Sequence, residues 1–226
     1  MTEVPAEPPQ FEFGRPFAYV FDDPDWLPKI TVGALFYLLA PLLIGWFFLF
    51  GYLAETARNI VAGDPKPLPQ WENVGRFFTE GARLVGVMLL WIAPLAVLTV
   101  AIVIPAIAID LADQHRAIQL VAAVAIGCLS CLLAPLWIAM ILLMPMSLIF
   151  VAVERRFSAA FEIRRIFALV RDNIGNYLLA ILILIIAHAI GGAGFGVLCI
   201  GVMFTAFWAL LIATHALAQV YRIAAK

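Results

Sequence analysis

Charged side chains are scarce in this chain of 226 residues, at 13%, whereas apolar residues make up 65%. A soluble domain has about a quarter charged and about half apolar residues, so the composition excludes an ordinary soluble fold. No run of Lys and Arg forms a nucleic-acid surface, and a net charge of −1 gives no attraction for a polyanion. We therefore expect an integral membrane protein with no nucleic-acid partner.

Cysteine is also sparse, and its placement argues against a disulfide framework. Cys128, Cys131 and Cys199 all lie inside apolar runs, and their number is odd. Cys128 and Cys131 have the C-x-x-C spacing, but no Cys or His at their depth completes a zinc site, so we expect them to pack against a neighbouring helix. No nucleophile stands beside a base either. The sequence predicts no enzyme, no catalytic residue, no metal and no cofactor.

Long apolar runs predict the fold. Residues 1–20 contain four prolines and lack the basic start and apolar core of a cleaved signal, so we expect a disordered tail there. Residues 21–226 are expected to form a single transmembrane domain, an all-α polytopic bundle of four to five spans with two amphipathic interfacial helices. The apolar runs cover about 30–53, 84–109, 117–153, 177–190 and 197–219, and the interfacial helices about 71–83 and 154–173.

The first apolar run leaves two alternatives open, because Pro41 lies at its centre. It is either one kinked span or two half-length helices folded back on each other. Lys and Arg gather in 55–83, in 154–173 and at the C-terminus, so these segments are predicted to be cytoplasmic in a multi-pass protein of the cell membrane. The fold-back gives thirteen basic residues inside and one outside, against eleven and three for a single span. Charge favours the fold-back, although halves of about twelve residues are too short to cross a bilayer.

The third run is too long for one straight crossing. Residues 117–153 would form a helix of about 55 Å, against a hydrocarbon core of about 30 Å. The run must tilt strongly or break, and Pro135 and Pro145 are the expected positions of a break.

Both interfacial helices have basic residues beside an apolar stripe. In the first, Trp71 begins a pattern with Val74, Phe78 and Val85 on one face. In the second, the arginines avoid the stripe of Ala160, Ile163, Phe167, Val170 and Ile174. The candidate contacts with membrane lipid or a protein partner are Trp71, Arg76, Arg155, Arg156, Arg164, Arg165 and Arg171.

Distinctive motifs concentrate in the first third of the chain. They are FDDPDW at 21–26, the Gly51-Tyr52 pair, the Arg58-Asn59 helix end, and a G-D-P…L-P-x-W run at 63–71. With these motifs the chain resembles, from about residue 21 to 222, the bacterial and archaeal membrane proteins of the domain of unknown function (DUF) 4013 family. The resemblance implies a helical membrane protein. Since that family has no agreed activity, it implies no catalytic residues.

Three further motifs have a structural interpretation that we favour. His188 and His215 lie in adjacent spans, but at depths too different for a shared haem, so we expect hydrogen-bonded structural roles near span ends. The glycines of 191–196 follow no strand and predict a tight turn between helices. Asp22, Asp23 and Asp25 are expected to cap a helix rather than bind a cation.

Two functions remain after these exclusions. The first is a non-enzymatic scaffold or accessory subunit that associates with lipids, with other membrane proteins or with a second copy of itself. It rests on the absence of charged residues within the spans. The second is a transporter or channel for a small or apolar solute, in which prolines supply unwound backbone.

Overall fold

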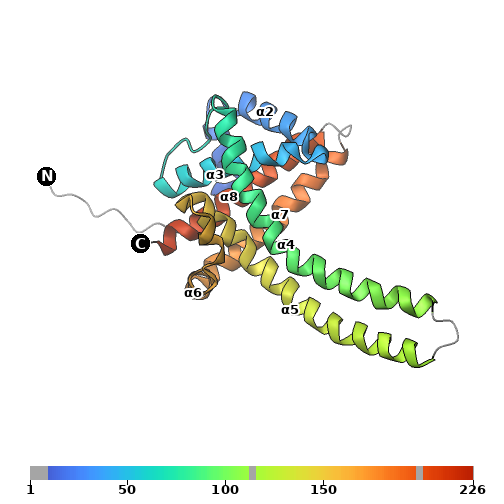
Figure 1. The fold of residues 1–226 in the computed structure, drawn as a ribbon. Helices are drawn as coiled ribbons and strands as arrows, with labels where there is room; N and C mark the ends of the chain where they lie inside the picture. Colours follow the sequence, from blue (N-terminus) through green and yellow to red (C-terminus); the bar gives the residue numbers. More distant parts are fainter. Residues whose placement is uncertain (1–9, 112–115, 197–200, 226) are drawn as a thin grey trace. The chain divides into compact units, whose positions relative to one another are not determined.

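The computed structural model describes residues 10–111, 116–196 and 201–225, in which every regular element is a helix (Figure 1). Four of these helices are long and apolar enough to cross a membrane, so the predicted all-α bundle with four to five spans is confirmed. The domain expected over 21–226 divides into two compact units. Unit 1 consists of Met1–Val85 and Met146–Lys226, and unit 2 of Gly86–Pro145.

The N-terminal segment is folded from residue 10 onward. It forms α1 (Arg15–Ala18) and the 3₁₀ helix η1 (Tyr19–Asp22), and it buries the side chains of Tyr19 and Val20 almost completely. The expectation of a disordered tail is therefore wrong for residues 10–20, because these aromatic and apolar side chains pack into unit 1. Residues 1–9 lie outside the described ranges.

The first apolar run is broken at Pro41, as its sequence allowed. Helix α2 (Trp26–Leu38) ends before the proline, η2 (Ala40–Leu42) contains it, and α3 (Ile44–Ala62) begins two residues later. Proline lacks an N–H and disfavours helix in the residue before it, so the chain turns here. Leu43 completes the turn with a positive φ of 64°.

Helix α8 (Gly201–Ala224) is the central helix of unit 1, and residues 12–41 run along it in the opposite direction. Successive contacts move steadily from the end of α8 towards its start. The contacting pairs, in that order, are Glu12 with Gln219, Tyr19 with Leu211, and Gly33 with Phe207. Further on, Pro41 lines the same cavity as Val202.

Helix α3 returns in the same direction as α8. Trp46 lines the cavity that Val202 also lines, the Tyr52 and Phe207 rings lie 5.7 Å apart, and Gly63 lies against Arg222. The fold-back is therefore confirmed. Each arm follows α8 over most of its length, because the first arm starts well before residue 30 and the second continues to Ala62. The length of the apolar run therefore gave too short an estimate for both helical arms.

The interfacial helix expected at 71–83 is not a separate element. Its residues form the first turns of α4 (Val74–Leu111), which continues through Pro94 and Pro105. Nothing between residues 74 and 93 interrupts the helix, since that stretch contains no proline. Two glycines allow α4 to cross α3 closely, with Gly81 against the Phe47 carbonyl and Gly51 against the Phe77 carbonyl.

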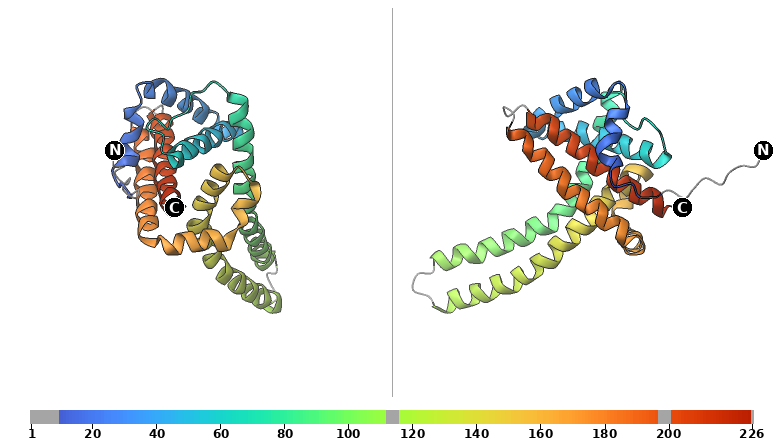
Figure 2. Two further views of the ribbon diagram at one scale, coloured as in Figure 1. Left: turned by 90° about the vertical axis from the view of Figure 1, so that its left-hand side faces the viewer. Right: turned by 180° about the vertical axis from the view of Figure 1, so that it is seen from behind.

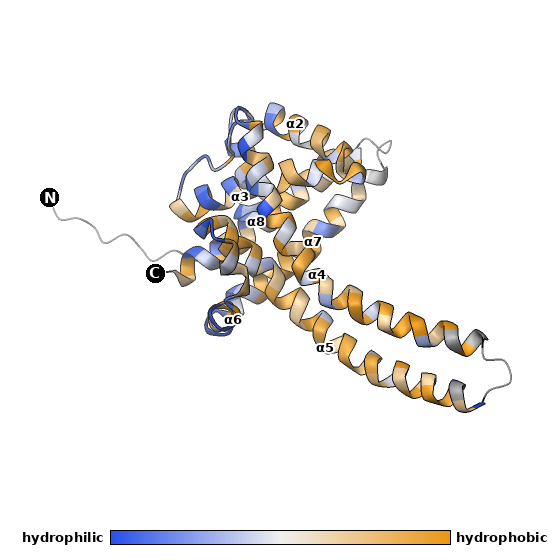
Figure 3. Ribbon diagram, viewed as in Figure 1, coloured by the Kyte–Doolittle hydropathy of each residue, from blue (hydrophilic) through white to orange (hydrophobic). Residues whose placement is uncertain are grey.

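Helix α5 (Arg116–Glu154) also passes through its prolines, Pro135 and Pro145, so the expected break is absent. Apolar helices tolerate proline because local adjustments satisfy the freed carbonyls. The two arms of unit 2 form a helical hairpin that is apolar almost throughout (Figure 3). Half of its described large apolar side chains are exposed, and among its described apolar residues only Val87, Leu95 and Ala122 are buried.

The segment 154–173 is also divided. The chain leaves α5 at Arg155, which has a φ of 56°, passes through η3 (Phe157–Phe161) and forms the short amphipathic helix α6 (Ile163–Asp172). Helix α7 (Ile174–Ala193) follows and lies beside α8 (Figure 2). The residues of the predicted glycine turn, 191–196, form the end of α7 and the 3₁₀ helix η4 (Gly194–Gly196). Residues 197–200 lie outside the described ranges.

Candidate functional site

The FDDPDW segment contains a buried ion pair that joins it to the loop before α4. Asp23 and Lys29 side chains are 3% and 6% exposed, and Lys29 Nζ donates to Asp23 Oδ2 at 2.6 Å and to the Leu68 carbonyl at 2.8 Å. Burial alone would raise the pKa of Asp23. Lys29 and the Asp25 N–H, which donates to Asp23 Oδ1, outweigh it and hold that pKa below its usual value.

The neighbouring aspartates have other roles than those expected. Asp22 pairs with Arg15 at 2.5 Å, and Asp25 precedes α2 without a side-chain capping bond. Within the described ranges, no group of three or more His, Cys, Asp or Glu side chains could hold a metal ion. The capping interpretation is thus wrong, because Asp23 turns inward to Lys29 instead.

Trp71 lies in the aromatic core of unit 1. Its ring stacks on Tyr52 with centroids 4.2 Å apart and on Phe36 at 5.0 Å, and its Nε1–H donates to the Lys29 carbonyl at 3.0 Å. The stacking of Trp71 on Tyr52 joins the 63–71 run to the Gly51-Tyr52 motif. The ring is engaged within the protein, so we do not retain Trp71 as a lipid contact.

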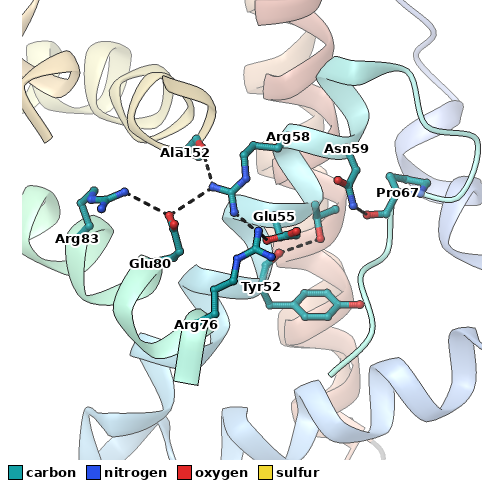
Figure 4. Close-up of polar contacts among 10 residues, drawn as sticks. Tyr52, Glu55, Arg58, Asn59, Pro67, Arg76, Glu80, Arg83 and Ala152 are labelled. Carbon is teal, nitrogen blue, oxygen red and sulfur yellow. Dashed lines mark hydrogen bonds and ion pairs between the residues drawn. The ribbon is translucent and has the colours of Figure 1, made fainter. Parts of the chain in front are cut away.

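Arg58 is the centre of a polar network between α3, α4 and the end of α5 (Figure 4). Its guanidinium pairs with Glu55 at 2.9 Å and Glu80 at 3.4 Å, and it donates to the Ala152 carbonyl at 2.8 Å. Ala152 is in the last turn of α5, where carbonyls lack helical partners and the helix dipole attracts a cation. Arg58 therefore caps α5, and its network holds three helices of unit 1 together.

The polar face of the first α4 turns completes this network. Arg76 pairs with Glu55 at 2.5 Å, and Arg83 pairs with Glu80 at 3.3 Å. Glu80 is only 15% exposed, whereas the Arg76 side chain is 44% exposed, so this face contacts α3 on one side and stays open on the other. Arg76 thus has a partner within the chain, and its contact with lipid or a protein partner stays a prediction.

The arginines of 154–173 fall into two groups. Arg156 and Arg165 each pair with both Glu154 and Glu162, at 2.5 to 3.1 Å. Arg165 also lies 5.0 Å from the centroid of the Phe150 ring. These two arginines fix the corner between α5 and α6. They hold the pKa of the Glu162 carboxyl below its usual value, mainly through the Arg165 hydrogen bond.

The other arginines of this segment remain exposed. Arg155 and Arg164 make no ion pair with any described residue, and Arg171 pairs only with its neighbour Asp172, both side chains being more than half exposed. Arg164 precedes Phe167 by three residues and Arg171 follows it by four, so all three side chains share one strip of α6. Phe167 is itself 55% exposed.

The histidines and cysteines are not part of the ion pairs described above. His215 is buried and bonds to Gln219, as expected of a structural histidine, whereas His188 is exposed on α7. Cys128 and Cys131 are exposed on α5, so the expected packing against a neighbouring helix does not occur within the described chain. Helix α5 turns these small side chains outward instead.

Sequence reasoning missed the Asp23–Lys29 pair and the Arg58 network. A signal for the first was present, because Lys29 stands at the edge of an apolar run six residues after Asp23. Buried lysine requires a partner, so its position pointed to a nearby carboxylate. The Arg58 network had a weaker signal in Glu55, three residues earlier on the same helix face. Its bond to Ala152 joins segments that no local pattern connects.

Comparison with protein families gives one match. The family described as "Protein of unknown function (DUF4013)" matches residues 34–200, which is more than half of the chain. Neither a curated protein nor a solved structure matches. The Gly51-Tyr52 pair, the Arg58 helix end and the loop to Trp71 fall inside the matched range, while FDDPDW precedes it. The chain therefore belongs to the DUF4013 family of proteins of unknown function.

Proposed function

We propose that this protein is a non-enzymatic membrane scaffold or accessory subunit that binds anionic lipid and associates with other membrane proteins or a second copy. The observation that carries the proposal is the division of its surface charges. In unit 1, Arg58, Arg76, Arg156 and Arg165 are paired with the chain's own carboxylates, whereas Arg155 and Arg164 have no such partner among the described residues. Paired charges stabilise the fold, and unpaired ones are free for a partner.

The apolar side of α6 supports a contact with the membrane surface. Ile166 and Val170 are buried in the protein, but Ile163 and Phe167 on the adjoining strip are exposed, as is Ile174. An interfacial helix buries such a strip at the boundary between headgroups and acyl chains. Arginines beside it then reach lipid phosphate, which suits the guanidinium geometry.

The orientation that we propose is cytoplasmic for both termini and for the segments 55–73 and 154–173. Unit 1 brings these segments together through the Glu12 bonds to Gln219, the Tyr221 hydroxyl bond to Glu154 and the Arg58 bond to Ala152. A shared side agrees with the positive-inside rule.

Single cysteines at Asp64, Ser158 and Ala225, in a background without the native cysteines, should react only with a cytoplasmic reagent, and so should one at Thr2. The three positions within the described ranges are exposed, so accessibility does not limit the reaction. A cysteine at Asp113 is the control for the other side. Labelling of Thr2 from outside, or opposite labelling of Asp64 and Ser158, would refute the proposed orientation.

The lipid contact predicts different effects for two double variants that remove the same charge. Arg164→Gln with Arg171→Gln should lower the retention of phosphatidylglycerol about thirtyfold, since each of the two basic residues near a headgroup contributes about 1 kcal/mol. Arg156→Gln with Arg165→Gln removes paired arginines and should change retention much less. Native mass spectrometry of protein taken from mixed vesicles, at low and high salt, measures the retained lipid.

Two outcomes would reject this contact. Equal losses in both double variants would indicate a general effect of charge on the segment. Unchanged retention in a correctly inserted Arg164→Gln, Arg171→Gln protein would leave these arginines only a role in orienting the chain during insertion. Labelling at Ser158 verifies the insertion in each variant.

A transporter for a small or apolar solute is the second candidate, and the broken helix favours it. A largely apolar cavity of about 420 Å³ lies near the break, lined by Tyr37, Trp46, His188 and Gly191 among others. Interrupted helices beside a cavity are a common design for solute sites in transporters. Solute uptake by proteoliposomes of the purified protein, compared with empty liposomes, separates this candidate from the scaffold.

A further inference from the structure

A second cavity in unit 1, of about 260 Å³, has a polar lining. It lies between the N-terminal segment, the end of α3 and the last turns of α8. Its lining side chains that are charged or form hydrogen bonds are Gln10, Glu12, Arg15, Tyr19, Asp64, His215, Gln219 and Arg222.

Positive and negative side chains line this cavity without forming ion pairs with each other. Arg15 is neutralised by Asp22. In contrast, no ion pair within 4.0 Å joins Arg222, Glu12 or Asp64 to any described residue. Among the described residues, the Asp64 carboxylate accepts one bond, from the Lys66 N–H at 2.8 Å. The cavity therefore holds one guanidinium and two carboxylates that lack ionic partners.

Hydrogen bonds fix the orientation of the His215 ring and leave its Nε2–H without an acceptor among the described residues. Gln219 Oε1 accepts from the Glu12 N–H at 2.9 Å, which directs Gln219 Nε2 towards His215 Nδ1, also at 2.9 Å. Nδ1 is then an acceptor, so the proton of the neutral ring is on Nε2. Nε2 has no hydrogen-bond partner among the described residues, although the residue is only 6% exposed. Tyr19 stacks on the ring at 4.3 Å and holds its plane.

The backbone at Gly63 makes room for the guanidinium. Gly63 ends α3 with a φ of +81°, which favours glycine, and a Cβ added there would lie 3.0 Å from Arg222 Nη2. A side chain at this position would push Arg222 away from its place beside the cavity. The same turn starts the loop that supplies Asp64.

From these groups we infer that the cavity binds a small zwitterion that carries an ammonium group together with a phosphate or carboxylate. Arg222 and the His215 Nε2–H donate to the anionic part, and Asp64 and Glu12 accept from the ammonium. Two sources share this chemistry: a soluble molecule such as phosphoethanolamine or an amino acid, and the headgroup of phosphatidylethanolamine. The site is separate from the lipid contact proposed for α6.

Thermal stability in the presence of four soluble probes tests the inference. O-phosphoethanolamine or glycine should raise the Tm of the purified protein by about 5–10 °C at a hundredfold excess over its Kd. Phosphate alone and ethanolamine alone, each meeting half of the site, should have little effect. Arg222→Gln and Asp64→Asn should each abolish the response, and Arg116→Gln, which does not line the cavity, should retain it.

The two substitutions are chosen to preserve the fold. Asp64→Asn retains an oxygen for the Lys66 N–H, and Arg222→Lys is a second variant that keeps the positive charge and should keep part of the response.

Vesicles of phosphatidylethanolamine or phosphatidylcholine, each mixed with phosphatidylglycerol, then identify the source of the ligand. A headgroup site retains phosphatidylethanolamine selectively and loses this selectivity in Arg222→Gln, whereas a soluble zwitterion gives no lipid selectivity.

The inference fails under any of three results. Phosphate alone could stabilise the protein as well as phosphoethanolamine does, which would indicate an anion site. The variants could respond as the wild type does, which would place the ligand elsewhere. A wild-type protein that neither responds to any soluble probe nor selects phosphatidylethanolamine would also overturn it.

Discussion

Gly81→Ala should destabilise the protein by about 3 kcal/mol or more, a loss of about 6–12 °C in Tm. The added methyl group would overlap the Phe47 carbonyl and lie 2.9 Å from the Gly51 nitrogen. Both obstacles are backbone atoms of α3, so no side-chain rotation can relieve the overlap. The crossing of α3 and α4 would have to open, and with it the ion pairs around Arg58.

Gly75→Ala is the matched control for this variant, because it makes the same change six residues earlier in the same helix. A Cβ at Gly75 meets nothing within 4 Å, and alanine favours helix over glycine by about 1 kcal/mol. Its Tm should therefore be equal to or slightly above that of the wild type. Similar Tm values for the two variants in detergent would show that α3 and α4 do not cross at Gly81.

Asp23→Asn should cost about 3–5 kcal/mol of folding free energy, the range typical when one partner of a buried ion pair is removed. Lys29 would keep its bond to the Leu68 carbonyl but would lose the only carboxylate that it contacts among the described residues. Asp25→Asn, two residues away in the same motif, changes an exposed carboxylate and should have little effect. Denaturant or thermal unfolding of the purified variants measures both.

A rescue variant and the pH dependence separate charge from packing at this site. Asp23→Leu combined with Lys29→Met removes both charges and should recover much of the lost stability. The pKa of Asp23 lies below its unfolded value of about 3.9, so the pair stabilises the protein fully above that pH. This stabilisation should disappear as the pH falls through the folded pKa, and Asp23→Asn should lack this acid transition. If the double variant is as unstable as Asp23→Asn, the charge argument is wrong.

The break at Pro41 could be predicted because its cause is local. Proline removes a donor wherever it occurs, and the count of basic residues independently favoured a fold-back. The rule that proline breaks a helix gave a wrong result at Pro135 and Pro145, where α5 continues. Local chemistry sets the cost of a proline in a helix, but the apolar surroundings decide whether that cost ends the helix.

Helix α6 shows a second limit of sequence patterns. Its periodicity identified an apolar stripe, yet one residue of that stripe, Val170, is buried, and another, Phe167, is exposed. In a membrane protein both lipid and protein interior are apolar, so hydropathy cannot distinguish the two environments. The pairing of Arg156 and Arg165, as against Arg164, depends on Glu154 at the end of the preceding helix, and no helical periodicity reports that contact.

The central position of α8 has a consequence for biosynthesis. Residues 12–41 leave the ribosome before the helix along which they lie, because α8 is made after α3, α4, α5 and α7. Until α8 is inserted, the Glu12 backbone lacks Gln219, the Tyr19 hydroxyl lacks the Leu211 carbonyl, and the glycine face of α2 lacks Phe207. Contacts so distant in sequence form slowly, and incomplete chains expose the surfaces that they will later bury. Helices α2 and α3 must therefore wait in the membrane for α8, and unit 1 can close only after α8 has been made.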